Sequence, residues 1–180
     1  MVLVIQAHPY PDRSRANKTL GQAIEGLAGV EVRSLYDLYP DFAIDVKAEQ
    51  QALARSTTVV WQHPIYWYAA PALLKLWFEH VLTTGWAHGE GGDALAGKRC
   101  LWVVTTGADA GSYAPAGAHK NEFDVFVPVI RQTARYCGMV WQDPIVVYGA
   151  HEISAAELDG YAADYRRRVE ALCAQEIGRG

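Results

Sequence analysis

The stretch from residue 59 to residue 82 constrains the fold more than any other part of the chain. It reads VVWQHPIYWYAAPALLKLWFEHVL. The apolar run 59–61 predicts a buried strand, which we expect to end at His63-Pro64 because proline cannot donate a ladder hydrogen bond. Pro71 stands where a helix over 71–83 would begin. Strand, aromatic turn and helix form half of a βαβ unit, and open α/β sheets bind ligands where such strands end.

The rest of the chain continues the alternation of strands and helices. Further strands are predicted at 2–7, 30–35, 99–105 and 140–148, the last despite Pro144. Helices are expected from Ser14 to Gly29, at 47–55, at 123–136 and from Ser154 to Ala174, with loops at 36–46, 85–97 and 106–121. This pattern predicts an α/β fold. We expect a single domain over 1–180, a flavodoxin-like doubly wound five-stranded parallel sheet of order 2-1-3-4-5 with helices on both faces.

Charge and cysteine content exclude several classes of protein. The formal net charge of −4 argues against nucleic-acid binding. Three widely spaced cysteines form no disulfide framework or zinc pattern, which is typical of core thiols in a reducing compartment. No signal peptide precedes the first strand, and residues 59–82 carry too many polar and proline residues for a membrane span.

The loop after the first strand lacks both common nucleotide-binding motifs. Neither Gly-x-Gly-x-x-Gly nor a Gly-Lys-Ser/Thr P-loop is present. A histidine, a hydroxyl, an amide and cationic side chains instead surround a helix start: His8, Arg13, Ser14, Arg15, Asn17 and Lys18. Such groups suit a single phosphate. The alternative is that Ser14 only caps the helix.

Two further loops at the same sheet edge add other kinds of contact. The turn 65–68 could supply a flat wall for a planar cofactor, although an interface or core cluster would have the same composition. Thr105-Thr106-Gly107 ends the fourth predicted strand, and Gly107 permits close approach of the backbone to a ligand. A phosphate site, a flat wall for a ring and donors to the edge of that ring together suit a flavin. No serine-hydrolase elbow or metal-binding histidine spacing competes with this interpretation.

Four motifs resemble the NAD(P)H:quinone oxidoreductase family of flavodoxin-like flavoproteins: AHPYPDRSRAN (7–17), HPIYWYAAPALLKLWFEHVL (63–82), TTG (105–107) and GSYAPAGAH (111–119). The segments SLYDLYPDFAID (34–45) and WQHP (61–64) add a resemblance to the ancillary quinone reductases of glutathione-regulated potassium-efflux systems. The likeness extends from Met1 to about Tyr148. Gly107-Ala108 replaces the usual Gly-Gly, and the loop that leads to His119 differs slightly in length.

The resemblance implies a cofactor site and a reaction. FMN, with FAD as the alternative, would contact His8, Ser14, Arg15, Ala16, Asn17, Ile65, Tyr66, Trp67, Tyr68, Thr105, Thr106, Gly107 and Ala108. Tyr113 and His119 would act at the pyrimidine edge of the flavin, although an exposed loop histidine is the other reading of His119. Hydride would pass from NADH or NADPH through the flavin to a quinone, with ping-pong kinetics. The alternative function is a regulatory flavin-binding subunit of a potassium-efflux antiporter.

Assembly and location are also predicted. Trp67, Tyr68, Trp77 and Phe78 exceed what covering one sheet face requires, which favours a homodimer. The resemblance places the protein in the cytoplasm, peripheral to the inner membrane when it binds an antiporter's cytoplasmic domain. The tyrosine-rich segment from Ser34 to Asp45, predicted to be exposed, would either contact that antiporter or border the flavin pocket.

Overall fold

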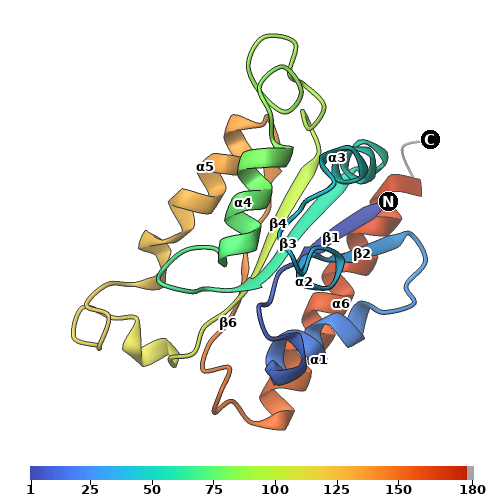
Figure 1. Ribbon diagram of the computed structural model, residues 1–180. Coiled ribbons are helices and arrows are strands. Elements are labelled where there is room, and N and C mark those ends of the chain that lie inside the picture. Colours follow the sequence, from blue (N-terminus) through green and yellow to red (C-terminus); the bar gives the residue numbers. More distant parts are fainter. Residues whose placement is uncertain (178–180) are drawn as a thin grey trace.

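The computed structural model describes residues 1–177 and forms a parallel sheet covered by helices on both faces (Figure 1). The strands are β1 (Val2–Gln6), β2 (Val30–Ser34), β3 (Thr58–Pro64), β4 (Arg99–Thr105), β5 (Val140–Trp141) and β6 (Ile145–Val147). Their order is β2-β1-β3-β4-β5, with β6 also paired to β4. The predicted fold class and strand order are confirmed. Residues 178–180 of the predicted domain lie outside the described part.

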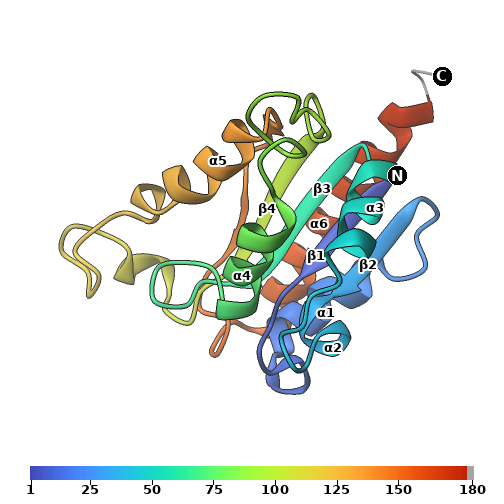
Figure 2. The ribbon, with the colours of Figure 1, turned by 45° about the horizontal axis from the view of Figure 1, so that its top comes forward.

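Six α-helices and three short 3₁₀ turns lie between and after the strands in residues 1–177. The α-helices are α1 (Arg15–Ile24), α2 (Leu35–Leu38), α3 (Val46–Arg55), α4 (Ala72–Val81), α5 (Val127–Tyr136) and α6 (Ala155–Ile177). The 3₁₀ turns are η1 (Pro11–Arg13), η2 (Ala110–Ser112) and η3 (Phe123–Val125). Helices α1 and α6 cover one face of the sheet, and α3, α4 and α5 cover the other (Figures 1 and 2). Within the described chain, no helix has the length and apolarity to cross a membrane.

Two hydrophobic cores lie on the two faces because successive side chains of a strand point in opposite directions. Val60 of β3 packs in the core under α1 and α6, whereas Val59 and Trp61 pack in the core under α3, α4 and α5. All seven residues of β3 are buried. Burial on both faces explains the near-continuous apolar runs of the central strands.

Proline interrupts one predicted strand, and it ends another where the sequence predicts. The predicted fifth strand is divided into β5 and β6, because Pro144 has no N–H group to donate to the ladder. Strand β3, in contrast, continues to Pro64, which pairs with Thr105. Ile65 N–H donates to Thr105 O of β4 at 2.9 Å. Successive residues of a central strand direct their N–H groups toward opposite neighbouring strands. The missing N–H of Pro64 therefore faces the side of β1, whose pairing has already ended.

Helix boundaries differ from the predictions where local geometry changes. Helix α1 ends at Ile24 instead of Gly29, and Pro71 is the N-cap of α4 instead of its first residue. The predicted helix 123–136 is divided into η3 and α5, with proline in the first turn of α5. The capping box of α6 is confirmed: Ser154 N–H donates to Glu157 Oε2 at 3.1 Å, and Glu157 N–H donates to Ser154 Oγ at 3.2 Å.

A buried carboxylate accounts for two wrong predictions of exposure. Glu49 is fully buried, and its Oε1 accepts hydrogen bonds from Arg33 Nη2 and the Tyr39 hydroxyl, both at 2.6 Å. Its Oε2 accepts from Trp77 Nε1 at 2.9 Å. Trp77 is therefore a core residue and not part of an interface. Segment 36–46 is likewise not wholly a surface loop, because α2 begins it and Tyr39 is buried against this carboxylate.

A buried histidine lies one residue before the end of β3. His63 is fully buried, its Nε2 accepts a hydrogen bond from Trp102 Nε1 at 2.8 Å, and its Nδ1 lies 2.9 Å from Pro64 O. These contacts define a neutral imidazole with its proton on Nδ1. Burial lowers the pKa of His63 from its ordinary value of 6.5 to about 4.

This pKa predicts how stability depends on pH. The unfolded chain takes up a proton on His63 near pH 6.5 and the folded protein only near pH 4, so the stability present above pH 6.5 is lost as pH falls through this window. Between pH 7 and pH 4, wild-type protein should lose about 3 kcal/mol more free energy of unfolding than His63→Gln, whose amide cannot titrate. Urea unfolding at both pH values measures the difference. Equal losses of free energy of unfolding in the two proteins would contradict a buried, neutral His63.

Candidate functional site

The loops that follow β1, β3, β4 and β6 meet at one edge of the sheet and enclose a cavity of about 430 Å³. Its lining combines cationic, hydroxyl and aromatic groups: His8, Tyr10, Arg13, Ser14, Arg15, Ala16, Pro64, Ile65, Tyr66, Thr105, Thr106, Gly107, Ala150 and His151. Among the described residues that line it, none carries a carboxylate side chain. Two arginines and two histidines without an opposing acid favour an anionic ligand.

The loop after β1 ends at Ser14, the N-cap of α1, as predicted. Ser14 Oγ accepts hydrogen bonds from the backbone N–H of Asn17 at 3.2 Å and from Asn17 Nδ2 at 3.3 Å. Ser14 is thus an N-cap and also lines the cavity, so the capping interpretation is confirmed and phosphate binding stays a prediction. The Arg15 guanidinium donates to Ile153 O, which ties the start of α1 to the loop before α6.

Asn17 lies behind this wall instead of in it. Its side chain is buried and does not line the 430 Å³ cavity. Asn17 Nδ2 donates to Thr105 Oγ1 at 2.9 Å, which joins the loop after β1 to the end of β4. Asn17 Oδ1 is buried without a hydrogen-bond partner among residues 1–177. The structure therefore gives Asn17 a supporting position beside the predicted phosphate site.

The predicted aromatic turn is a two-residue hairpin. Tyr66 and Ala69 exchange backbone hydrogen bonds of 3.0 Å in both directions. Between them, Trp67 and Tyr68 have φ values of 50° and 63°. Asparagine and glycine normally occupy such positions, and an aromatic residue held there costs about 1–3 kcal/mol. Trp67 is nevertheless 94% exposed. Strained, exposed aromatic residues at the ligand-binding edge of a sheet indicate a functional constraint.

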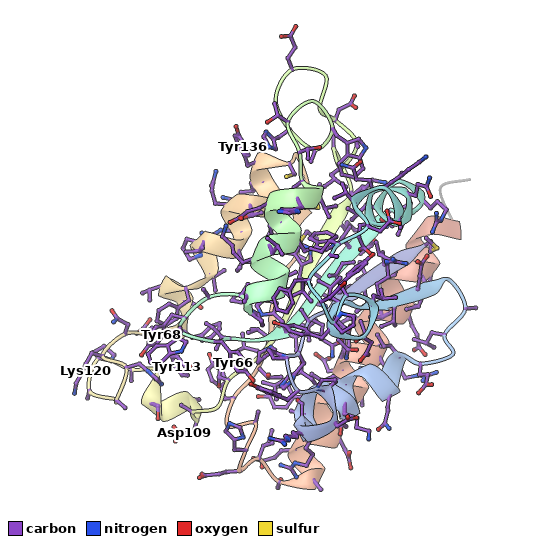
Figure 3. The ribbon with its side chains drawn as sticks, viewed as in Figure 1. Tyr66, Tyr68, Asp109, Tyr113, Lys120 and Tyr136 are labelled. Carbon is purple, nitrogen blue, oxygen red and sulfur yellow. The ribbon has the colours of Figure 1, made fainter. Side chains whose placement is uncertain are left out.

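A second cavity, of about 240 Å³, adjoins the first one. It shares Ile65 and Gly107 with the larger cavity, and its other lining residues are Trp67, Tyr68, Ala108, Tyr113 and His119. Figure 3 shows Tyr66, Tyr68 and Tyr113 gathered at this end of the sheet, whereas Tyr136 lies at the far end of α5. Cationic and hydroxyl groups thus lie beside aromatic walls in two adjoining hollows.

Tyr113 and His119 lie together, although six residues separate them on an irregular loop. Their rings stack with centroids 4.3 Å apart and planes inclined by 22°. His119 is half-buried, so it is not simply a loop histidine exposed to solvent. Its Nδ1 lies 3.1 Å from the Tyr68 hydroxyl, and its Nε2 is buried without a partner among the described residues. Burial raises the pKa of Tyr113 above its ordinary value.

His8 and Gly107 take positions that agree only partly with the expectations from sequence. His8 Nδ1 accepts a hydrogen bond from Tyr10 N–H at 3.0 Å, and burial lowers the pKa of its imidazole. A Cβ atom on Gly107 would lie 3.2 Å from His151 Cδ2 and Nε2. The close approach that Gly107 permits is therefore to a histidine ring of this chain.

Sequence reasoning missed the loop after β6. Ala150 and His151 line the larger cavity, and Ala150 N–H donates to Thr106 O at 2.8 Å. This loop follows a weakly patterned strand interrupted by proline. This loop could have been predicted from the strand order, because every loop at the carboxyl edge of an open α/β sheet is a potential ligand contact.

Comparison with known proteins gives the same fold. Residues 1–169 match a family described as having a flavodoxin-like fold. The chain is 48% identical over 100% of both sequences to the glutathione-regulated potassium-efflux system ancillary protein KefF of Salmonella typhimurium. It is similar to the structure of general stress protein 14 of Treponema denticola in complex with FMN (TM-score 0.89, 35% identity, 95% and 98% of the two chains). An NADPH-quinone reductase from P. pentosaceus is similar at a TM-score of 0.84, with 27% identity over 93% and 96%.

Proposed function

Because the chain belongs to this family of flavodoxin-like proteins, we propose that it is a cytoplasmic flavoenzyme that passes hydride from NADH or NADPH through FMN to a quinone. The basic cavity at the carboxyl ends of β1, β3 and β4, whose described lining has no carboxylate and which adjoins an aromatic hollow, carries the proposal. The FMN complex of the Treponema relative and the quinone reductase among the similar structures support it.

The residues present fit a flavin monophosphate. Arg13, His8 and His151 would supply cations or donors for the phosphate, and Ser14, Arg15 and Ala16 at the positive end of the α1 dipole line the same cavity. The neighbouring cavity of about 700 Å³ includes four acidic residues in its lining: Asp109, Glu152, Glu157 and Asp164. Those carboxylates would repel the second phosphate of FAD, so we favour FMN.

Bound FMN would supply the redox chemistry, and the chain would supply position and electrostatics. Trp67 and Tyr68 form part of the wall against which a planar ring would lie. Tyr113 and His119 offer a hydroxyl and an imidazole in the same hollow. Such donors stabilise negative charge that develops in a partly dry site. A single hollow would admit the hydride donor and the quinone in turn, which gives ping-pong kinetics.

A second candidate function is regulation of a potassium-efflux antiporter. The 48% identity to an ancillary protein of such a system favours it. In the segment from Ser34 to Asp45, Leu38 and Phe42 are 46% and 41% exposed, which makes them the available contacts for the antiporter's cytoplasmic domain. Binding there would place the protein at the inner membrane. A regulatory subunit without turnover would bind flavin but fail to oxidise NADH or NADPH with a quinone.

We also propose a homodimer that uses the face formed by α4 and α5. Val129 and Tyr136 are 61% and 65% exposed on this face. A groove of about 490 Å³ lies between the two helices, and its lining includes Phe78, Leu82 and Ile130. Ala69 and Ala70 of the aromatic turn region also line this groove. The interface would therefore border the active site.

The enzymatic proposal predicts a defect in His119→Ala. Flavin reduction by NADH or NADPH in stopped flow should slow roughly tenfold to a thousandfold, because a donor to the charged ring edge is lost. FMN affinity should change much less, because the phosphate-binding loop is intact. His80→Ala, which removes an exposed histidine of α4, is the matched control and should reduce at the wild-type rate. Reduction of His119→Ala at that rate would remove His119 from the mechanism.

The homodimer proposal predicts a change of mass on substitution at the exposed apolar face. Sedimentation of wild-type protein should give twice the chain mass of 19.8 kDa. Val129→Glu should give monomer, because a buried unpaired charge at an interface is costly. Leu38→Glu places the same charge on an exposed apolar residue of α2, outside the proposed interface, and should leave the dimer intact. A monomeric, fully active wild-type protein would refute the proposal.

A further inference from the structure

Tyr68 makes a contact with His119 that the reaction outlined above does not use. Its hydroxyl oxygen lies 3.1 Å from His119 Nδ1, and the two rings meet edge to face at a centroid distance of 5.6 Å. A second tyrosine also contacts this imidazole: Tyr113 stacks on the His119 ring with centroids 4.3 Å apart. Figure 3 shows Tyr68 and Tyr113 lying next to each other. The imidazole of His119 is thus held by two tyrosines.

Tyr68 is itself fixed in place by its backbone and by a second ring. It occupies the left-handed region at φ 63° within the hairpin after β3. Its ring stacks on Phe126 with centroids 5.0 Å apart and planes inclined by 22°. His119 lies on the loop after β4, 51 residues further along the chain. The contact therefore connects two loops of the site through a side chain that has little freedom to move.

The direction of this hydrogen bond fixes the position of the imidazole proton. A phenol is a stronger acid than a neutral imidazole N–H, and an imidazole nitrogen is a stronger acceptor than a phenolic oxygen. Tyr68 O–H therefore donates to His119 Nδ1, and the ring proton is on Nε2. His119 Nε2 is buried without a partner in the part of the chain that the structure describes. A buried N–H without an acceptor is unfavourable, which points to an acceptor supplied by a ligand.

We propose that Tyr68 is a positioning residue, which holds His119, a lining residue of the 240 Å³ hollow, as the Nε2–H tautomer and so keeps this N–H as the donor for negative charge on a bound ligand ring. The proposal rests on the proposed flavin function for the identity of that ligand. The tautomer itself depends only on contacts within this chain. A tyrosine at position 68 thus has a role that a phenylalanine ring of the same shape cannot fill.

The tautomer can be measured without any turnover. In protein labelled with ¹⁵N-histidine and free of flavin, the His119 Nδ1 and Nε2 chemical shifts report which nitrogen carries the proton. Wild-type protein should show the Nε2–H form, and Tyr68→Phe should shift toward a mixture of both tautomers. Tyr161→Phe removes a hydroxyl outside this hollow and serves as the control. A wild-type Nδ1–H form, or shifts unchanged in Tyr68→Phe, would overturn the proposal.

Kinetics of the FMN-loaded protein provide a second readout. Tyr68→Phe keeps the ring that stacks on Phe126, so FMN affinity should stay close to that of wild-type protein. Flavin reduction should slow on the order of tenfold, as expected when one oriented hydrogen bond is lost. An unchanged reduction rate in Tyr68→Phe would contradict the positioning role. If wild-type flavin is not reduced by NADH or NADPH at all, the proposed function fails, while the tautomer measurement still decides the assignment of His119.

Discussion

The parallel register of β1, β3 and β4 is the constraint on which the site depends. Gln6 pairs with Gln62, and Pro64 pairs with Thr105, so the three strands release their loops at one edge of the sheet. The side-chain hydrogen bond from Asn17 to Thr105 then joins the first loop to the third. Because β3 is buried along its whole length, its position cannot shift without disrupting both hydrophobic cores. The loops are therefore presented by a rigid scaffold.

Local strain at this edge is offset by packing elsewhere. Trp67 and Tyr68 hold unfavourable backbone conformations, and Tyr68 is kept there by its contacts with Phe126 and His119. On the same face of the sheet, Glu49 binds Arg33, Tyr39 and Trp77 in a buried network that fixes α3 against α4. Removing one partner from such a network leaves an uncompensated charge and costs about 3–5 kcal/mol. The flavodoxin-like scaffold thus tolerates a turn that would be unstable in isolation.

The sequence was sufficient for the topology because alternating strands and helices permit few arrangements. It was also sufficient to predict which loops gather around a cavity, since loops at the carboxyl ends of strands share one edge. Burial was harder to predict: Trp77 looked like an interface residue because its partner Glu49 lies 28 residues away. The contact between Tyr68 and His119 spans 51 residues and has no local signature. His151 was missed because β6 is only three residues long and follows a proline.

The central claim is that the basic cavity at this edge binds the phosphate of FMN. Titration of flavin-free protein with FMN and with riboflavin, which has the same ring system but no phosphate, tests the claim most directly. The account predicts one FMN per chain and binding at least roughly a hundredfold tighter than that of riboflavin, because two or more charge-assisted hydrogen bonds to the phosphate are at stake. Equal affinity for the two compounds, or no binding of FMN, would contradict it.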